Sequence, residues 1–149
     1  MTQSIHKVFM DTSVVFAAVL SPAGGARKLF QLGEAGLLRL IVGPNVLREC
    51  EAVARRKAPD SLPTLAQLLA ISRVETSPAP THQQIEIARA LVDYQPDAII
   101  LAEAIGAAPD WFVTHDKSHF LKKSHTLKIP FYVGTPGDLI QYLIDRLVE

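Results

Sequence analysis

The chain alternates between short, continuously apolar runs and longer segments in which apolar residues recur with helical spacing. The apolar runs at 8–10, 37–42, 111–114 and 129–133 predict buried strands. Strands without a polar face are typical of parallel sheets that are covered by helices on both sides. The helical pattern predicts helices over 14–20, 26–35, 46–57, 64–71, 82–92, 98–107 and 139–148.

This order of strands and helices predicts an α/β fold with a mostly parallel central sheet. The length of 149 residues suits one domain, and the chain contains no internal repeat, so we expect a single domain over 1–149.

Several helix boundaries can be predicted from local signals. Asn45 is expected to cap the helix after the Gly43-Pro44 turn, and Asp97 is expected to begin the next-to-last helix after Pro96. That helix is apolar on every side apart from Glu103, which predicts burial. Residues 135–138 resemble a capping box with proline at the first helical position.

Composition narrows the class of protein. Hydrophobic residues make up 48% and charged residues 20% of the chain, which excludes a disordered linker. No apolar stretch reaches the ~20 residues that cross a bilayer and no leader segment is visible, so we expect a protein without a membrane anchor. The single cysteine, Cys50, has no partner for a disulfide or a thiolate metal site, which favours a cytoplasmic location.

Three aspartates lie where an α/β sheet collects ligands. Asp11 and Asp116 follow predicted strands, and Asp97 begins a buried helix. If the three carboxylates converge, each pair at ~4 Å repels by about 4 kcal/mol at an effective dielectric near 20, so the cluster needs a cation or shared protons. Oxygen ligands favour Mg²⁺ or Mn²⁺.

Each acidic residue also has a structural explanation. Asp11 and Asp116 fit ordinary turns, and Asp97 fits a helix cap. Glu49 and Glu51 lie on opposite edges of the apolar stripe of their helix, so periodicity does not choose between them. Glu103 either supports a site or has a hydrogen-bond partner elsewhere.

Five short motifs, in this order and spacing, resemble the PIN domain family, and more narrowly the VapC-type toxin ribonucleases of bacterial toxin-antitoxin systems. They are residues 10–15 (MDTSVV), 20–29 (LSPAGGARKL), 43–49 (GPNVLRE), 96–102 (PDAIILA) and 113–117 (VTHDK). The resemblance covers the chain from Val8 to about Leu139.

The resemblance implies a three-layer α/β/α sandwich and an acidic Mg²⁺ or Mn²⁺ site that hydrolyses RNA. The family's acidic quartet, as catalytic residues and metal ligands, matches Asp11, Glu49, Asp97 and Asp116, and its hydroxyl positions match Thr12, Ser13 and Thr114. The choice of Glu49 over Glu51 follows from the resemblance alone. The resemblance also implies a homodimer and a cognate antitoxin protein.

The RNA would need a local basic surface, because 15 Lys and Arg balance 15 Asp and Glu. Lysines are dense between His115 and Lys128, and we expect Lys117, Lys122 and Lys123 to form a phosphate-binding rim, unless they only solvate a loop.

A noncatalytic PIN domain that binds RNA or protein is the alternative function. It is suggested by Tyr94 and Ser118, which occupy positions where many relatives carry further aspartates. A phosphatase of the type that uses two aspartates after its first strand is disfavoured by Ser13, which stands where the second would be.

Overall fold

A five-stranded parallel sheet forms the centre of the protein, for which the computed structural model describes residues 5–116 and 129–148. The strand order is β3-β2-β1-β4-β5, and every neighbouring pair is parallel. The strands are β1 (His6–Met10), β2 (Leu38–Val42), β3 (Glu75–Thr76), β4 (Trp111–Val113) and β5 (Tyr132–Gly134). The predicted parallel sheet is confirmed.

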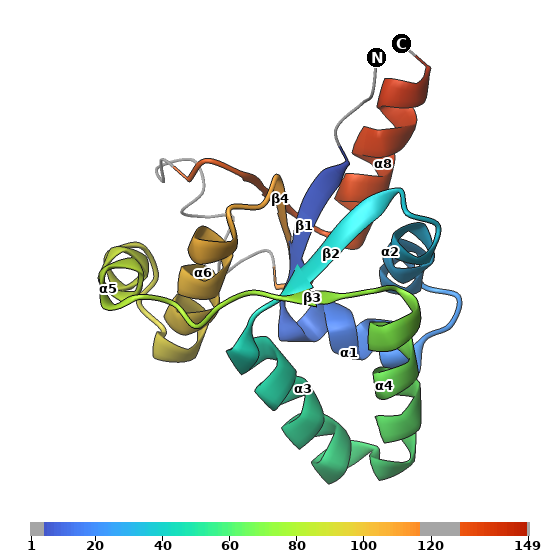
Figure 1. The fold of residues 1–149 in the computed structure, drawn as a ribbon, viewed down its shortest axis with the longest axis horizontal. Coiled ribbons are helices and arrows are strands. Elements are labelled where there is room, and N and C mark those ends of the chain that lie inside the picture. The colour runs from blue at the N-terminus through green and yellow to red at the C-terminus, as the bar shows by residue number, and fades with distance from the viewer. Residues whose placement is uncertain (1–4, 117–128, 149) are drawn as a thin grey trace.

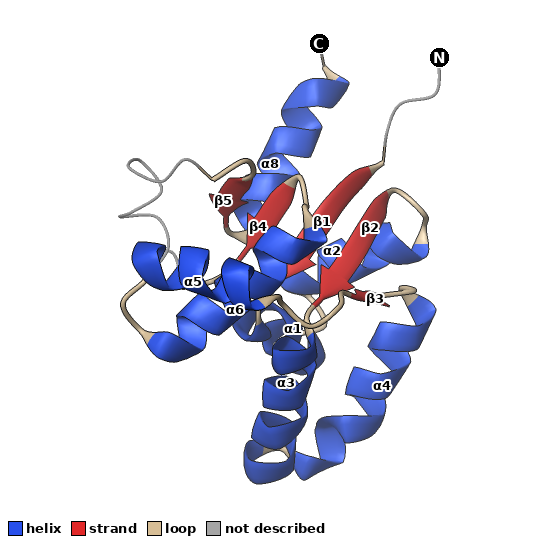
Figure 2. Ribbon diagram, turned by 60° about the vertical axis from the view of Figure 1, so that its left-hand side comes forward, coloured by secondary structure: helices blue, strands red, loops and turns tan. Residues whose placement is uncertain are grey.

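Helices cover both faces of this sheet, as Figure 1 shows. On one side lie α2 (Gly25–Glu34) and α8 (Pro136–Leu147), and on the other lie α5 (His82–Leu91) and α6 (Gln95–Ala107). The three-layer α/β/α sandwich is therefore confirmed. Beyond the carboxyl ends of the strands lie α1 (Thr12–Leu20), α3 (Pro44–Lys57), the 3₁₀ turn η1 (Pro59–Ser61) and α4 (Leu62–Ile71). Figure 2 shows α3 and α4 extending away from the sheet.

The core joins the sheet to these helices. Phe9 and Met10 of β1 and Phe112 and Val113 of β4 are fully buried, as the uninterrupted apolar runs predict. The ring of Phe9 stacks on that of Phe112 at a centroid distance of 5.6 Å. Among the described residues, no helix has the length and apolar character needed to cross a membrane.

The starts of α1, α3 and α6 lie before the positions that their sequence signals predict. The cap of α3 is Gly43, with Pro44 at the first helical position, so the prediction that Asn45 caps it was wrong. Similarly, α6 begins at Gln95, which places Asp97 inside its first turn and not at its start. In α1 the aspartate itself is the cap, so Thr12 is helical and does not belong to a separate turn.

Two strand predictions need correction. The run 129–133 was predicted as a strand, but β5 begins only at Tyr132, because its partner β4 begins at Trp111 and Pro130 has no N–H for a ladder. The two-residue strand β3 was not predicted, since Glu75 and Thr76 are exposed and polar, and only pairing with β2 makes them a strand. The predicted capping box at Thr135 and Asp138 is confirmed.

Candidate functional site

Asp11 lies at the carboxyl end of β1, between β2 and β4, where the direction of the strand order changes. Its carboxylate caps α1: Oδ1 accepts from the backbone N–H of Val14 at 3.2 Å and from Ser13 Oγ at 2.6 Å. The other oxygen, Oδ2, accepts from Thr114 Oγ1. With 6% of its surface exposed, Asp11 is a buried acid held by three neutral donors.

Burial raises the pKa of Asp11, although the hydrogen bonds from Ser13, Thr114 and Val14 act in the opposite direction. The three donors cannot fully replace the water that an ionised carboxylate loses on burial. A positive ion beside Asp11 would remove that cost. The electrostatics of the position thus favour cation binding.

The segment after β4 is hydrogen-bonded to the two hydroxyls that contact Asp11. The N–H of His115 donates to Ser13 Oγ at 3.1 Å, and the N–H of Asp116 donates to Thr114 Oγ1 at 2.9 Å. The backbone of Asp116 is therefore fixed beside Asp11, while its side chain is exposed. Ser13 and Thr114 each link the end of β1 to the end of β4.

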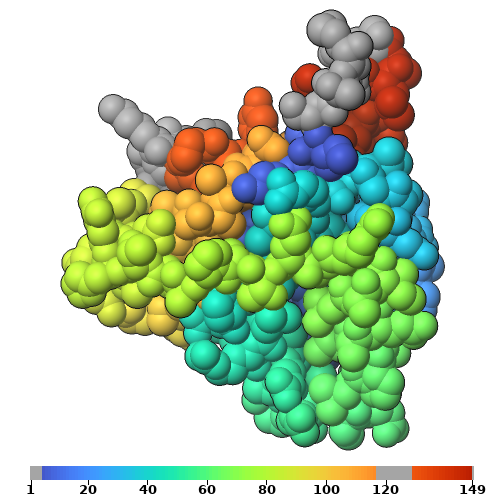
Figure 3. Space-filling view, in the orientation of Figure 1, coloured from blue at the N-terminus to red at the C-terminus, as the bar shows by residue number. Residues whose placement is uncertain are grey.

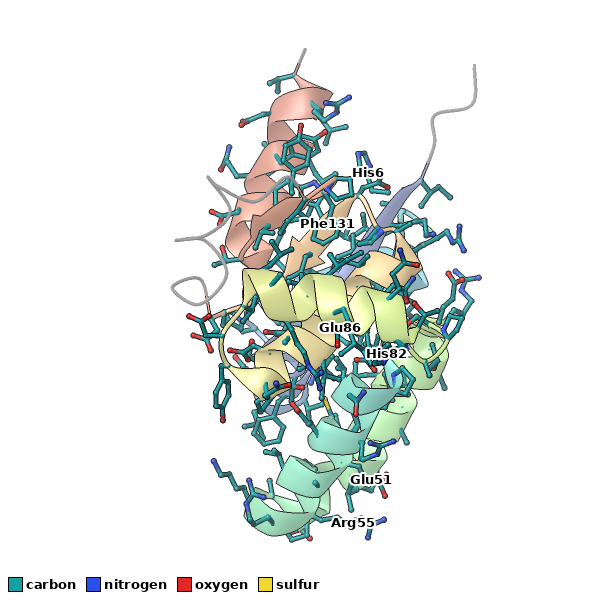
Figure 4. All side chains as sticks on the ribbon, turned by 90° about the vertical axis from the view of Figure 1, so that its left-hand side faces the viewer. His6, Glu51, Arg55, His82, Glu86 and Phe131 are labelled. Atoms are coloured by element: carbon teal, nitrogen blue, oxygen red, sulfur yellow. The ribbon has the colours of Figure 1, made fainter. Side chains whose placement is uncertain are left out.

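Glu49 faces the same position from α3. Thr12 Oγ1 donates to Glu49 Oε2 at 2.7 Å. The residue that follows Asp11 in the chain is therefore in direct contact with Glu49. Glu51 instead pairs with Arg55 at 2.7 Å on the exposed side of α3 (Figure 4). The tertiary contact therefore distinguishes two glutamates between which helical periodicity does not choose.

The remaining candidates differ in what the structure shows of them. Asp97 is half-buried in the first turn of α6. Within residues 5–116 and 129–148, no three Asp, Glu, His or Cys side chains stand close enough to hold a metal ion. The convergence of Asp11, Asp97 and Asp116 on one cation therefore stays a prediction. Lys117, Lys122, Lys123 and Ser118 lie outside the described residues.

Cys50 contributes no chemistry at this site. Burial, followed by the nearby charges of Glu49 and Asp11, raises the pKa of its thiol to about 12. The thiol is therefore neutral at pH 7, and only oxygen atoms are available here as anionic ligands.

Glu103 of α6 lies, fully buried, against the first turn of α3. Its Oε2 accepts from the backbone N–H of Asn45 at 2.7 Å and from Asn45 Nδ2 at 3.0 Å. Glu103 therefore performs the capping role predicted for Asn45, since the cap residue Gly43 has no side chain. The sequence marks Glu103 as unusual but contains no signal that identifies Asn45 as its partner.

The pH dependence of stability should reveal this buried acid. Burial raises the pKa of Glu103, so the folded protein binds its proton more strongly than the unfolded chain does. This contribution makes the wild type less stable as the pH rises through the interval between the unfolded and folded pKa values. Glu103→Gln does not titrate. We expect its melting temperature, relative to wild type, to increase as the pH is raised above about 4.3, the ordinary pKa of a glutamate. If the difference in melting temperature between Glu103→Gln and wild type does not change with pH, the pKa of Glu103 is not raised on folding.

Comparisons with known proteins agree with this fold. The family model described as "PIN domain" matches residues 7–118. No curated protein matches the chain. Among solved structures, VapBC2 of Rickettsia felis bound to a promoter DNA fragment superposes with a TM-score of 0.66 and 14% identity, over 85% of this chain and 96% of that one.

Two further structures are similar. DNA-bound VapBC of Salmonella typhimurium gives a TM-score of 0.67 at 14% identity, covering 88% of this chain and 98% of that one. VapC20 of Mycobacterium tuberculosis, a toxin that cleaves the sarcin-ricin loop, gives a TM-score of 0.54 at 17% identity. The superposition covers 77% of this chain and 94% of that one. At these identities the similarity shows a shared fold. Because the family model spans most of the sequence, the chain belongs to the PIN domain family.

Proposed function

We propose that this protein is a metal-dependent ribonuclease and the toxin of a toxin-antitoxin system. The observation that carries the proposal is Asp11, a buried carboxylate at the switch point of the sheet that is held by neutral donors. Its chain neighbour Thr12 contacts Glu49, and Thr114, which donates to Asp11, accepts from the backbone N–H of Asp116. Membership of the PIN family and the fold shared with VapC proteins support it.

The cation would be Mg²⁺ or Mn²⁺, held by Asp11, Asp97 and Asp116 with the help of Glu49. The all-oxygen donor set and the cost of burying Asp11 fit a hard cation at this position. When bound, such an ion lowers the pKa of a coordinated water and screens the charge of a phosphodiester. Hydrolysis then requires no serine or cysteine nucleophile, in keeping with the neutral thiol of Cys50.

The other residues of the site orient these carboxylates. The hydroxyls of Ser13 and Thr114 each donate a hydrogen bond to a different oxygen of Asp11, which fixes the plane of that carboxylate. Thr12 donates a hydrogen bond to one oxygen of Glu49, which leaves the other oxygen for a further contact. We propose that this second oxygen of Glu49 orients the attacking water.

We further propose a cytoplasmic homodimer that is neutralised by a cognate antitoxin. The solved VapBC structures are complexes of toxin and antitoxin, and both were determined on DNA. Lys117, Lys122 and Lys123 stay predicted RNA contacts.

The direct test is hydrolysis of single-stranded RNA by the purified protein. We expect cleavage with Mn²⁺ or Mg²⁺ and none in EDTA, because the carboxylates supply no nucleophile by themselves. Gel analysis of a labelled RNA measures both conditions. Cleavage that continues in EDTA would overturn the metal mechanism. RNA binding without cleavage in Mn²⁺ would instead support the noncatalytic alternative.

A further inference from the structure

A chain of side-chain contacts connects the buried acid Glu103 to the exposed Arg48, which directly precedes Glu49. Asn45 donates through Nδ2 to Glu103 Oε2 at 3.0 Å, and its Oδ1 accepts from Arg48 Nη1 at 3.0 Å. The amide of Asn45 can have only this orientation, because a flipped amide would face the Glu103 carboxylate with its own oxygen. A fully buried residue thereby fixes the direction of Asn45, and Asn45 fixes Arg48.

Arg48 directly precedes Glu49 on α3 and lies on the flank of the helix away from its buried residues. Successive helical residues are about 100° apart, which places Asn45 about 40° and Arg48 about 100° from Glu49, in one direction around the helix. The buried residues Val46, Cys50 and Ala54 lie in the opposite direction. Arg48 is exposed, so its guanidinium is within reach of solvent, on the residue next to Glu49.

Arg55, on the same helix, is arranged differently. This helix carries four cationic residues, Arg48, Arg55, Arg56 and Lys57, more than any other helix in the described part of the chain. Arg55 pairs with Glu51 through two hydrogen bonds, at 3.1 and 2.7 Å, which neutralise its charge locally. Arg48 instead donates to an uncharged amide, and that contact leaves its charge in place. Figure 3 shows that α3 and α4 project from the body of the molecule, which leaves this helix accessible.

We propose that Arg48 binds a backbone phosphate of the RNA next to the scissile one, with Asn45 as the residue that positions it. This inference rests on the proposed ribonuclease function. A guanidinium held in place loses less conformational freedom on binding, and its planar fork suits phosphate oxygens. Arg48 would thus orient the RNA strand along α3, with the scissile phosphate near Asp11 and Glu49.

The test measures RNA affinity without catalysis. Binding of a fluorescein-labelled single-stranded RNA is followed by anisotropy in EDTA over a range of KCl concentrations. Arg48→Gln should weaken binding about tenfold at low salt and should lower the slope of log Kd against log salt by about 0.7, the value for one phosphate contact on a single strand. Arg55→Gln is the matched control on the same helix, and we expect affinity close to wild type because Glu51 already pairs with that arginine.

A second variant tests the role of Asn45. Asn45→Ala keeps the charge of Arg48 but removes its hydrogen bond, so binding should weaken in the wild-type background. In the Arg48→Gln background, Asn45→Ala should have no further effect, whereas damage to the fold of α3 would weaken binding in both. Melting temperatures of all variants measure that damage directly.

The outcomes separate this inference from the proposed function. If Arg48→Gln binds like Arg55→Gln while the wild type cleaves RNA in Mn²⁺, the inference is wrong and the ribonuclease function stands. A wild type that binds no RNA in EDTA also overturns the inference. If that protein in addition fails to cleave RNA in Mn²⁺, the proposed function is overturned with it.

Discussion

Replacing Asp11 with asparagine is expected to reduce RNA cleavage by at least about 100-fold while the protein stays folded. Mutation of a residue that only supports a metal ligand lowers metal affinity or activity about 10- to 100-fold. Loss of a ligand's charge should lower activity by at least about as much. Asparagine caps a helix about as well as aspartate, so the contact with Val14 N–H survives. Initial cleavage rates in Mn²⁺ measure the loss, and circular dichroism measures the fold.

Thermal melting separates the capping role of Asp11 from its proposed metal role. Mn²⁺ at a hundredfold excess over its Kd should add ~2.7 kcal/mol to the wild type, or about 5 to 11 °C in Tm at this chain length. Asp11→Asn should lose most of that increment. Asp60→Asn, an identical change on the exposed turn η1, should keep it. Equal metal-induced shifts in wild type and Asp11→Asn would show that Asp11 is not a ligand.

Gly43→Ala is expected to destabilise the protein by about 3 kcal/mol, or about 6 to 12 °C in Tm. The φ of Gly43 is −90°, which any residue adopts, so the backbone is not the reason. The added methyl would lie 2.2 Å from both Cδ and Oε1 of Glu103, a distance that requires displacement of a fully buried side chain. Differential scanning calorimetry gives the change in Tm.

Two further variants identify the cause of that loss. Gly137→Ala lies in the first turn of α8, where the added methyl would meet only Thr135 Oγ1 at 3.7 Å, and we expect little change. Glu103→Ala removes Cδ and Oε1, the two atoms nearest to the methyl added at Gly43, and keeps only Cβ, at 2.7 Å. Combined with Gly43→Ala, it should therefore cost less than the sum of the two single changes. Additive losses would mean that Gly43 is required for another reason.

The sequence best predicted the helices and strands that a local pattern of apolar residues defines. The apolar runs of β1 and β4 are buried strands, and the apolar helix that contains Glu103 is a buried helix. Errors occurred at boundaries, where a neighbour in space decides. Tyr132 begins β5 because β4 begins at Trp111, and Glu75 is in a strand because β2 lies beside it. Neither neighbour is visible in the local pattern.

The candidate site divides in the same way. Asp11 and Asp116 could be selected from the sequence, because parallel strands present their carboxyl ends at one edge of the sheet, and each of these residues follows a strand. Glu49 could not be selected by periodicity, since Glu51 is an equally good candidate on the other edge of the apolar stripe. The hydroxyl of Thr12 distinguishes them, and it reaches Glu49 only after α1 packs on α3.

The sequence by itself determined the α/β architecture, the burial of the strands and the identity of the acids at their ends, because alternation and burial are properties of short segments. Only the tertiary structure decided which glutamate contacts Thr12 next to Asp11, and that Glu103 caps α3 at Asn45. The contact of Thr12 with Glu49 joins residues 37 positions apart, and that of Asn45 with Glu103 joins residues 58 positions apart. The distance between such residues depends on how the helices pack around the sheet, and no local pattern of polar and apolar residues specifies that packing.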